Sequence, residues 1–184
     1  KDWLLTFKTG VQDIGHVLTI LAPWDKPVYV TRAWCVFETL AALDARVERQ
    51  VVLPPKQKQA FINKLRTEEI GHATYMSIFG DVNIFNCKSA NPVDRDAILG
   101  LIGKRTDVNE ALMLPLKDFY RATALEAVGK MSGTSKEDGW AFNATAALHK
   151  ALGDLNAALP WYQRALEAHR LGGSGSSEPD QATA

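Results

Sequence analysis

Glu38 is the residue whose surroundings in the sequence most clearly need a chemical explanation. The segment Thr31–Leu43 carries two apolar rows at helical spacing, so the expected helix is buried over most of its girth. A carboxylate in such a segment is partly desolvated, as tuned catalytic acids are. Two plainer roles stay open, because Glu38 could pair with a nearby arginine or lie on a solvated edge of the helix.

Arg32 and Trp34 are the candidate ligand or anion contacts beside this carboxylate. Arg32 stands where a loop enters the expected helix, and helix N-termini suit a phosphate or a carboxylate. An ion pair with Asp25 is the competing role for Arg32. Trp34 is expected to point into the domain, with Trp24 packed against it as core structure. Thr31 is expected to cap the helix, because its hydroxyl can accept a free backbone N–H.

Composition and charge narrow the function classes. The chain has 184 residues, 46% of them apolar, with 21 lysines and arginines against 21 aspartates and glutamates. A net charge of zero implies no broad basic face for nucleic acid and gives no support for membrane binding. No apolar run approaches the roughly 20 residues that span a bilayer. Cys35 and Cys87 have no partner at ligand spacing, which predicts reduced thiols, no metal site and a cytoplasmic location.

Three short apolar runs are the expected strands, and helical patterns alternate with them. The runs are Val17–Leu21, Arg49–Leu53 and Val82–Asn86. This alternation predicts an α/β fold with a parallel sheet covered by helices on both faces. Three strands are few for such a sheet, and the chain opens on a helix without methionine. We therefore expect the N-terminal part of the domain to be missing.

The run Trp34–Glu38 (WCVFE) opens a helix after a strand and a polar loop, and it resembles the Toll/interleukin-1 receptor (TIR) domain family. In that family an S-x-W-C-x-x-E-L run opens the helix after the fourth strand. Here the serine is absent, and Thr31 could replace its capping role. The wider match is to a TIR-like domain of algal and protist proteins with the run PW..P....RAWCxxE, which is met by Pro23-Trp24, Pro27 and Arg32–Glu38.

This resemblance implies a flavodoxin-like α/β domain at residues 1–105, present as its C-terminal half and able to self-associate. In catalytically active TIR domains the glutamate of this helix is the catalytic residue of NAD cleavage, and Glu38 takes that position. Loss of nicotinamide leaves an oxocarbenium-like ribosyl centre, which a fixed carboxylate can stabilise. Many TIR domains are assembly modules without activity, so NAD is implied as cofactor only by the enzyme alternative, and otherwise none is expected.

The segment Trp140–Arg170 resembles a single tetratricopeptide repeat of the kind found in kinesin light chains and related algal proteins. Gly153 matches the turn between two helices. The small and large side chains of the repeat's protein-binding hairpin are matched by Phe142, Ala146, Ala158, Tyr162 and Ala165. One repeat cannot bury both of its faces, so it either starts a truncated array or caps the helix expected at Val108–Lys130. A generic helical hairpin stays the alternative.

Four segments follow along the chain: the TIR-like domain at 1–105, a linker helix at 106–134, the hairpin at 135–171 and a disordered Gly/Ser-rich tail at 172–184. The leading hypothesis is a cytoplasmic protein-interaction or signalling scaffold that binds protein partners or peptides through its helical repeat. One alternative is an NAD-cleaving hydrolase with Glu38 as its catalytic carboxylate. Another, supported only by the repeat, is a kinesin-light-chain-like cargo adaptor.

Overall fold

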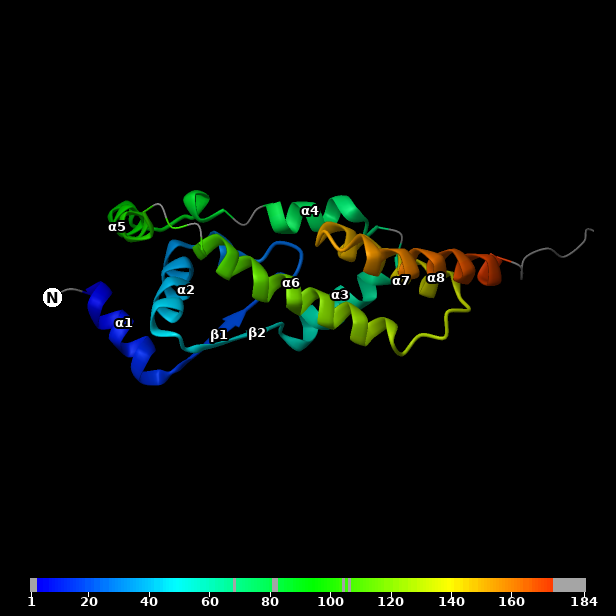
Figure 1. Cartoon of the computed structure of the whole chain (residues 1–184), viewed down its shortest axis with the longest axis horizontal. Coiled ribbons are helices and arrows are strands. Elements are labelled where there is room, and N and C mark those ends of the chain that lie inside the picture. The colour runs from blue at the N-terminus through cyan, green and yellow to red at the C-terminus, as the bar shows by residue number, and fades with distance from the viewer. Residues whose placement is uncertain (1–2, 68, 81–82, 104, 106, 174–184) are drawn as a thin grey trace, which may run out of the picture. The chain divides into compact units, whose positions relative to one another are not determined.

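The computed structural model describes residues 3–67, 69–80, 83–103, 105 and 107–173, and these are mostly helical (Figure 1). In chain order the elements are α1 (Trp3–Ile14), β1 (His16–Ile20), the 3-10 helix η1 (Val28–Thr31), α2 (Ala33–Ala45), β2 (Glu48–Val52), α3 (Pro55–Leu65), α4 (His72–Gly80), the 3-10 helix η2 (Ile84–Asn86), α5 (Pro92–Ile102), α6 (Asp107–Val128), α7 (Lys136–Ala151) and α8 (Leu155–Gly173).

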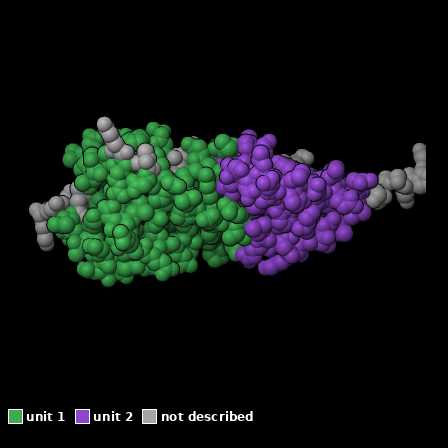
Figure 2. All heavy atoms as spheres, in the orientation of Figure 1, with its two compact units in different colours: residues 1–61, 76–122 green, residues 62–75, 123–184 purple. Residues whose placement is uncertain are grey.

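The chain divides into two compact units (Figure 2). Unit 1 comprises residues 1–61 and 76–122, and unit 2 comprises residues 62–75 and 123–184. The disordered tail was expected at 172–184, but Gly172 and Gly173 belong to α8, and residues 174–184 lie outside the described residues. Within the part of the chain that the structure describes, none of the helices combines the length and apolar character needed to cross a membrane.

Unit 1 contains a two-stranded parallel sheet. β1 pairs with β2 in register from His16 opposite Glu48 to Ile20 opposite Val52. Two of the three predicted parallel strands are thus confirmed, with each strand starting one residue earlier than expected. A parallel strand pair flanked by helices agrees with the coarse α/β prediction for this part of the chain.

The third expected strand, Val82–Asn86, is wrong over its described part. Ile84–Asn86 is a 3-10 helix, and Val82 lies outside the described residues. The Asn83 side chain accepts a hydrogen bond from the Phe85 amide at 3.0 Å, which turns the backbone away from an extended path. Parallel pairing occurs two residues beyond Asn86, as an isolated bridge between Arg32 and Lys88.

Helix α2 is buried along most of its length, as its two apolar rows predict. Its fully buried residues include Val36, Phe37 and Leu40. The expected N-cap is wrong, because Thr31 belongs to η1 and its hydroxyl donates to the Val28 carbonyl at 2.9 Å. Arg32 takes the cap position without a side-chain cap bond. The extra 3-10 turn therefore displaces the start of the helix by two residues.

The two tryptophans near this helix belong to separate aromatic groups. The Trp34 ring packs edge-on against Phe37, with centroids 6.1 Å apart, and also lies 6.1 Å from Phe7. The Trp24 ring instead lies 5.1 Å from Phe61. Trp34 thus points inward as expected, but Trp24 packs on α3 and not against Trp34. The Trp24 carbonyl also accepts a hydrogen bond from the Tyr120 hydroxyl.

Helix α6 carries Pro115 in its interior, and Arg49 compensates for it. A proline lacks the N–H that would bond the carbonyl four residues earlier, here that of Ala111. Arg49 Nη1 donates to this carbonyl at 2.9 Å, so the backbone acceptor stays satisfied. The helix was expected at Val108–Lys130, which agrees with its observed bounds to within two residues.

Unit 2 contains the expected helical hairpin of α7 and α8. The Ser135 hydroxyl accepts from the Asp138 amide at 3.1 Å, so α7 begins with a side-chain cap. Gly153 turns the chain with a φ of +82°, a conformation that favours glycine. Asp154 then caps α8 by accepting from the Ala157 amide at 3.0 Å. Ser135 thus fixes the start of α7, and Gly153 and Asp154 fix the turn between the two helices.

Candidate functional site

Glu38 lies half-buried on α2, one turn after Trp34 and Cys35. Burial raises the pKa of Glu38 above its ordinary value, and the positive charge of Arg32 opposes this shift. Among the described residues, Glu38 forms no ion pair within 4.0 Å and no side-chain hydrogen bond. The expected alternative of a direct salt bridge is therefore not found in the part of the chain that the structure describes.

A thiol and a phenol lie within electrostatic reach of Glu38. Burial is the main cause of the raised pKa of Cys35 and of Tyr29, and the negative charge of Glu38 adds to both shifts. The Tyr29 hydroxyl also forms a 2.6 Å hydrogen bond with Thr39 Oγ1. Sequence reasoning missed Tyr29 and Thr39, because neither residue stands out by type or spacing.

An open hollow of about 460 Å³ lies at the entry of α2 and of α5. It is lined by Arg32, Trp34, Lys88, Ser89, Ala90, Asn91 and Asp94. The structure thus brings together Arg32 and Trp34, the two ligand contacts expected from the sequence. Glu38 is not among the residues that line this hollow, so the structure separates the expected catalytic carboxylate from the two expected contacts.

Asp94 accepts hydrogen bonds from two other residues that line this hollow. One of its oxygens accepts from Trp34 Nε1 at 3.3 Å, and the other accepts from Asn91 Nδ2 at 3.0 Å. Asn91 in turn caps α5 by accepting from the Val93 amide. An asparagine followed by a proline is typical of a helix start, whereas no local pattern in the sequence indicates that Lys88 or Ser89 lies near Arg32.

The competing role of Arg32 as a partner of Asp25 is not supported. Within the described residues no ion pair joins Arg32 to any carboxylate within 4.0 Å. Arg32 is exposed, and it interacts with Glu38 electrostatically, without an ion pair within 4.0 Å. The guanidinium is therefore available at the rim of the hollow.

The residues that match the tetratricopeptide pattern lie mainly inside the hairpin. Phe142, Ala146, Ala158 and Ala165 are buried, with exposed fractions of 1%, 0%, 2% and 4%. Tyr162 is half-buried and Gly153 forms the turn. Small side chains at these positions allow the two helices to approach closely. These residues thus hold the hairpin together, and a partner would meet other side chains.

An exposed apolar stripe runs along α8 beside these buried residues. Leu155, Leu159 and Leu166 are 64%, 58% and 64% exposed, and Tyr162 lies among them. Their spacing of four, three and four residues places them on one face of the helix. We call these four residues the α8 stripe. The sequence alone does not indicate this stripe, because tertiary packing decides which face of α8 meets α7.

Comparison with known proteins adds no assignment, because no family model, no curated protein and no solved structure matches this chain. The resemblances to the TIR-like and tetratricopeptide families therefore rest on the quoted motifs. Within the described residues, no group of three or more histidine, cysteine, aspartate or glutamate side chains could hold a metal ion.

Proposed function

We propose that this chain is a protein-interaction scaffold whose helical hairpin binds a partner through the α8 stripe. The observation that carries the proposal is the exposure of three leucines in line on a helix whose neighbouring face, with Ala158 and Ala165, is buried. Burying a leucine fully is worth roughly 1.5–3 kcal/mol, so three leucines more than half exposed offer a partner substantial binding energy. Lone exposed leucines are ordinary on a surface, but an aligned row marks an interaction site.

An amphipathic helix is the kind of partner that best fits the α8 stripe. The α8 stripe is narrow and straight, and no charged residue occupies its four positions. The sequence after residue 173, SGSSEPDQATA, holds no large apolar side chain that could cover it. A partner with apolar residues three and four positions apart would pack between α8 leucines as helices do in repeat arrays.

Site-specific photo-crosslinking of the full chain tests this proposal. A benzophenone amino acid at Leu159 is expected to give one crosslinked protein, identified by mass spectrometry, that is absent when the label replaces exposed Lys150 on α7. Adding Leu155→Ser and Leu166→Ser should abolish that product. Equal crosslinking from both positions, or persistence in the double variant, would contradict the proposal.

We also propose that unit 1 self-associates, as the TIR-like resemblance implies. A groove of about 250 Å³ there has an apolar floor that includes Phe37 and Leu40, with Leu5 and Leu101 at its edge. These two leucines are 62% and 49% exposed. In sedimentation experiments Leu101→Asp should reduce self-association, whereas Val93→Asp on the same helix should not. A monomeric parent chain would contradict this part of the proposal.

NAD cleavage with Glu38 as the catalytic carboxylate is a second candidate function. It is supported by a half-buried carboxyl with a raised pKa and without an ion-pair partner among the described residues. If Glu38 stabilises a ribosyl cation, Glu38→Gln should lower turnover about 10²-fold or more with the fold intact. An assay of nicotinamide release that finds no turnover by the parent chain would remove this candidate.

A further inference from the structure

We propose that Arg32 and Lys88 form a binding site for a phosphate-class anion of charge −2 or greater. The site lies in the hollow of about 460 Å³ that both side chains line. This inference concerns unit 1 alone and does not depend on the α8 stripe. It also involves Lys88, which no motif in the sequence singled out.

The backbone holds the two cationic residues side by side. The Lys88 amide donates to the Thr31 carbonyl at 2.7 Å, and the Ala33 amide donates to the Lys88 carbonyl at 2.9 Å. These two bonds bracket Arg32 and form an in-register parallel bridge with Lys88. Neighbouring strands lie about 4.8 Å apart, and in-register residues project from the same face. Both positive side chains therefore leave the backbone from adjacent points on one side.

Like charges directly opposite each other are destabilising, so this pair needs a counter-charge. Neither Arg32 nor Lys88 has an ion-pair partner within 4.0 Å among the described residues. Asp94 is the acid that lines the hollow, and its two oxygens already accept from Trp34 and Asn91. Glu38 acts on Arg32 only through space. The chain thus holds two cations together and supplies no bound carboxylate to neutralise them.

The chemistry of the lining favours a phosphate group over a single carboxylate. A guanidinium and an ammonium together carry a charge of +2, and the Asp94 carboxylate, which is bonded by neutral donors, leaves the lining a net charge of +1. A phosphate offers more oxygens than a carboxylate, so it can meet both cations at once. The planar guanidinium can bind two phosphate oxygens at once, whereas the lysine ammonium acts as a point charge. Ser89 and Asn91 add polar groups to the wall, and Trp34 adds an apolar one. A phosphate with a small organic substituent fits this mixed lining.

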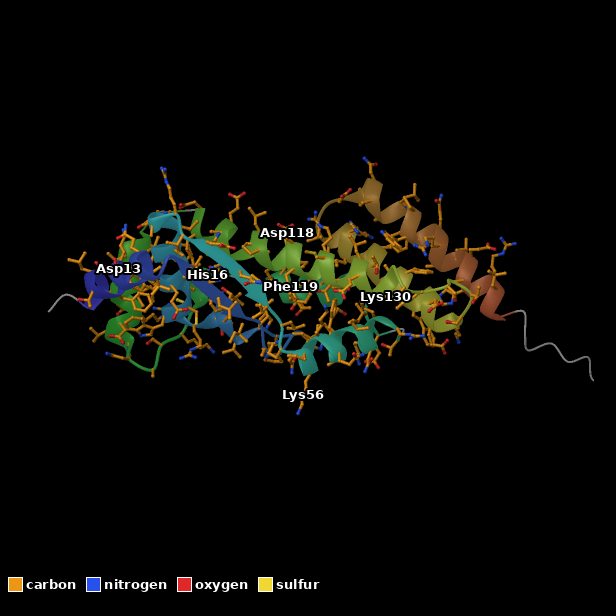
Figure 3. The ribbon with its side chains drawn as sticks, turned by 90° about the horizontal axis from the view of Figure 1, so that it is seen from below. Asp13, His16, Lys56, Asp118, Phe119 and Lys130 are labelled. Carbon is orange, nitrogen blue, oxygen red and sulfur yellow. The ribbon has the colours of Figure 1, made fainter. Side chains whose placement is uncertain are left out.

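Calorimetric titration of the full chain with pyrophosphate and with inorganic phosphate, at fixed low ionic strength, tests the site. Pyrophosphate is expected to bind more tightly because of its higher charge. Arg32→Gln and Lys88→Gln should each weaken binding about tenfold or more, the loss expected for a charged hydrogen bond. Lys56→Gln is the matched control, because Lys56 is exposed on α3 and its side chain extends away from the ribbon (Figure 3).

The indole ¹H–¹⁵N signal of Trp34, assigned with Trp34→Phe, gives a second readout at the site. Of the five tryptophan signals, that of Trp34 should shift most on adding pyrophosphate. Circular dichroism of each variant checks that the fold is kept. The proposal is overturned if pyrophosphate does not bind, if the control weakens binding as much as the two site variants, or if a folded Lys88→Gln chain keeps the parent affinity.

Discussion

The two units differ in how much of each motif reaches the surface. In unit 1, the run that carries the TIR-like resemblance is mixed: Arg32 is exposed and Glu38 is half-buried, whereas Phe37 beside them is buried. In unit 2, Phe142 and Ala158 are buried inside the hairpin, with exposed fractions of 1% and 2%. The first motif thus combines packing with surface side chains, whereas these residues of the second serve packing.

The two units also differ in what accompanies their buried apolar residues. Unit 1 adds polar groups that meet specific backbone or hydroxyl acceptors, such as Arg49 on Ala111 and Tyr29 on Thr39. The hairpin relies on alanines at the contact between α7 and α8, and Gly139 allows an approach at which an added Cβ would lie 2.9 Å from the His169 ring. Changes of side-chain volume therefore test the hairpin, and removal of a hydrogen-bond donor tests unit 1.

Phe142→Ala is expected to have the largest effect. Phe142 lies 5.9 Å from the Trp161 ring, and the Arg164 guanidinium stacks over it at 4.2 Å. Truncating a buried phenylalanine leaves a cavity and costs about 3–5 kcal/mol of unfolding free energy. Chemical denaturation followed by circular dichroism measures the loss. Leu166→Ala on the exposed stripe should change stability by no more than about 0.5 kcal/mol. Equal effects of the two changes would mean that the buried face of the hairpin is misassigned.

Ala158→Leu tests the same interface by adding volume. Ala158 is 2% exposed where α8 meets α7, so a larger side chain must displace its neighbours. Overpacking of this kind destabilises by about 1–3 kcal/mol. Thermal unfolding compares this variant with Ala73→Leu, which places the same side chain at an exposed position of α4. An unchanged melting temperature for Ala158→Leu would contradict the close packing of the hairpin.

Arg49→Met is the corresponding test in unit 1. It leaves the Ala111 carbonyl without its donor, which should cost about 1–2 kcal/mol. Pro115→Ala restores a backbone N–H in the position to bond that carbonyl, so the double variant should recover most of the loss. A double-mutant cycle of unfolding free energies measures this coupling. Additive effects of the two changes would show that Arg49 does not compensate for Pro115.

Local signals in the sequence predicted much of the fold. The apolar runs near Val17–Leu21 and Arg49–Leu53 pair in parallel, and Ser135 and Gly153 bound the hairpin helices as expected. These features depend on neighbouring residues, which the sequence displays directly. The third strand failed because the side chain of Asn83 competes with strand pairing for the backbone.

The candidate site was predictable only in part. The sequence identified Arg32 and Trp34, and the structure places both in one hollow. It could not identify Lys88, because the bridge to Arg32 joins residues that are 56 positions apart and leaves no local pattern. The α8 stripe was visible as spaced leucines, but which face of α8 meets α7 is decided by tertiary packing.

Glu38→Gln is expected to have the smallest effect on the free energy of unfolding. Whether that free energy rises or falls shows whether burial or favourable contacts dominate at Glu38. Burial disfavours the charged carboxylate, so the pKa of Glu38 is raised in the folded chain. The resulting penalty is fully present above this raised folded pKa and absent below the unfolded value of roughly 4.3. Glu38→Gln should therefore stabilise the chain near neutral pH by less than about 1 kcal/mol. This advantage should fade as the pH falls through the folded pKa.

The variant Arg32→Gln is the control for this last prediction. The guanidinium favours the charged form of Glu38, so Arg32→Gln should raise the pKa of Glu38 further and enlarge the neutral-pH advantage of Glu38→Gln. Urea unfolding of the four combinations, from acid to neutral pH, measures both effects. A Glu38→Gln chain that is less stable at neutral pH would mean that the carboxylate gains more from its surroundings than burial costs it.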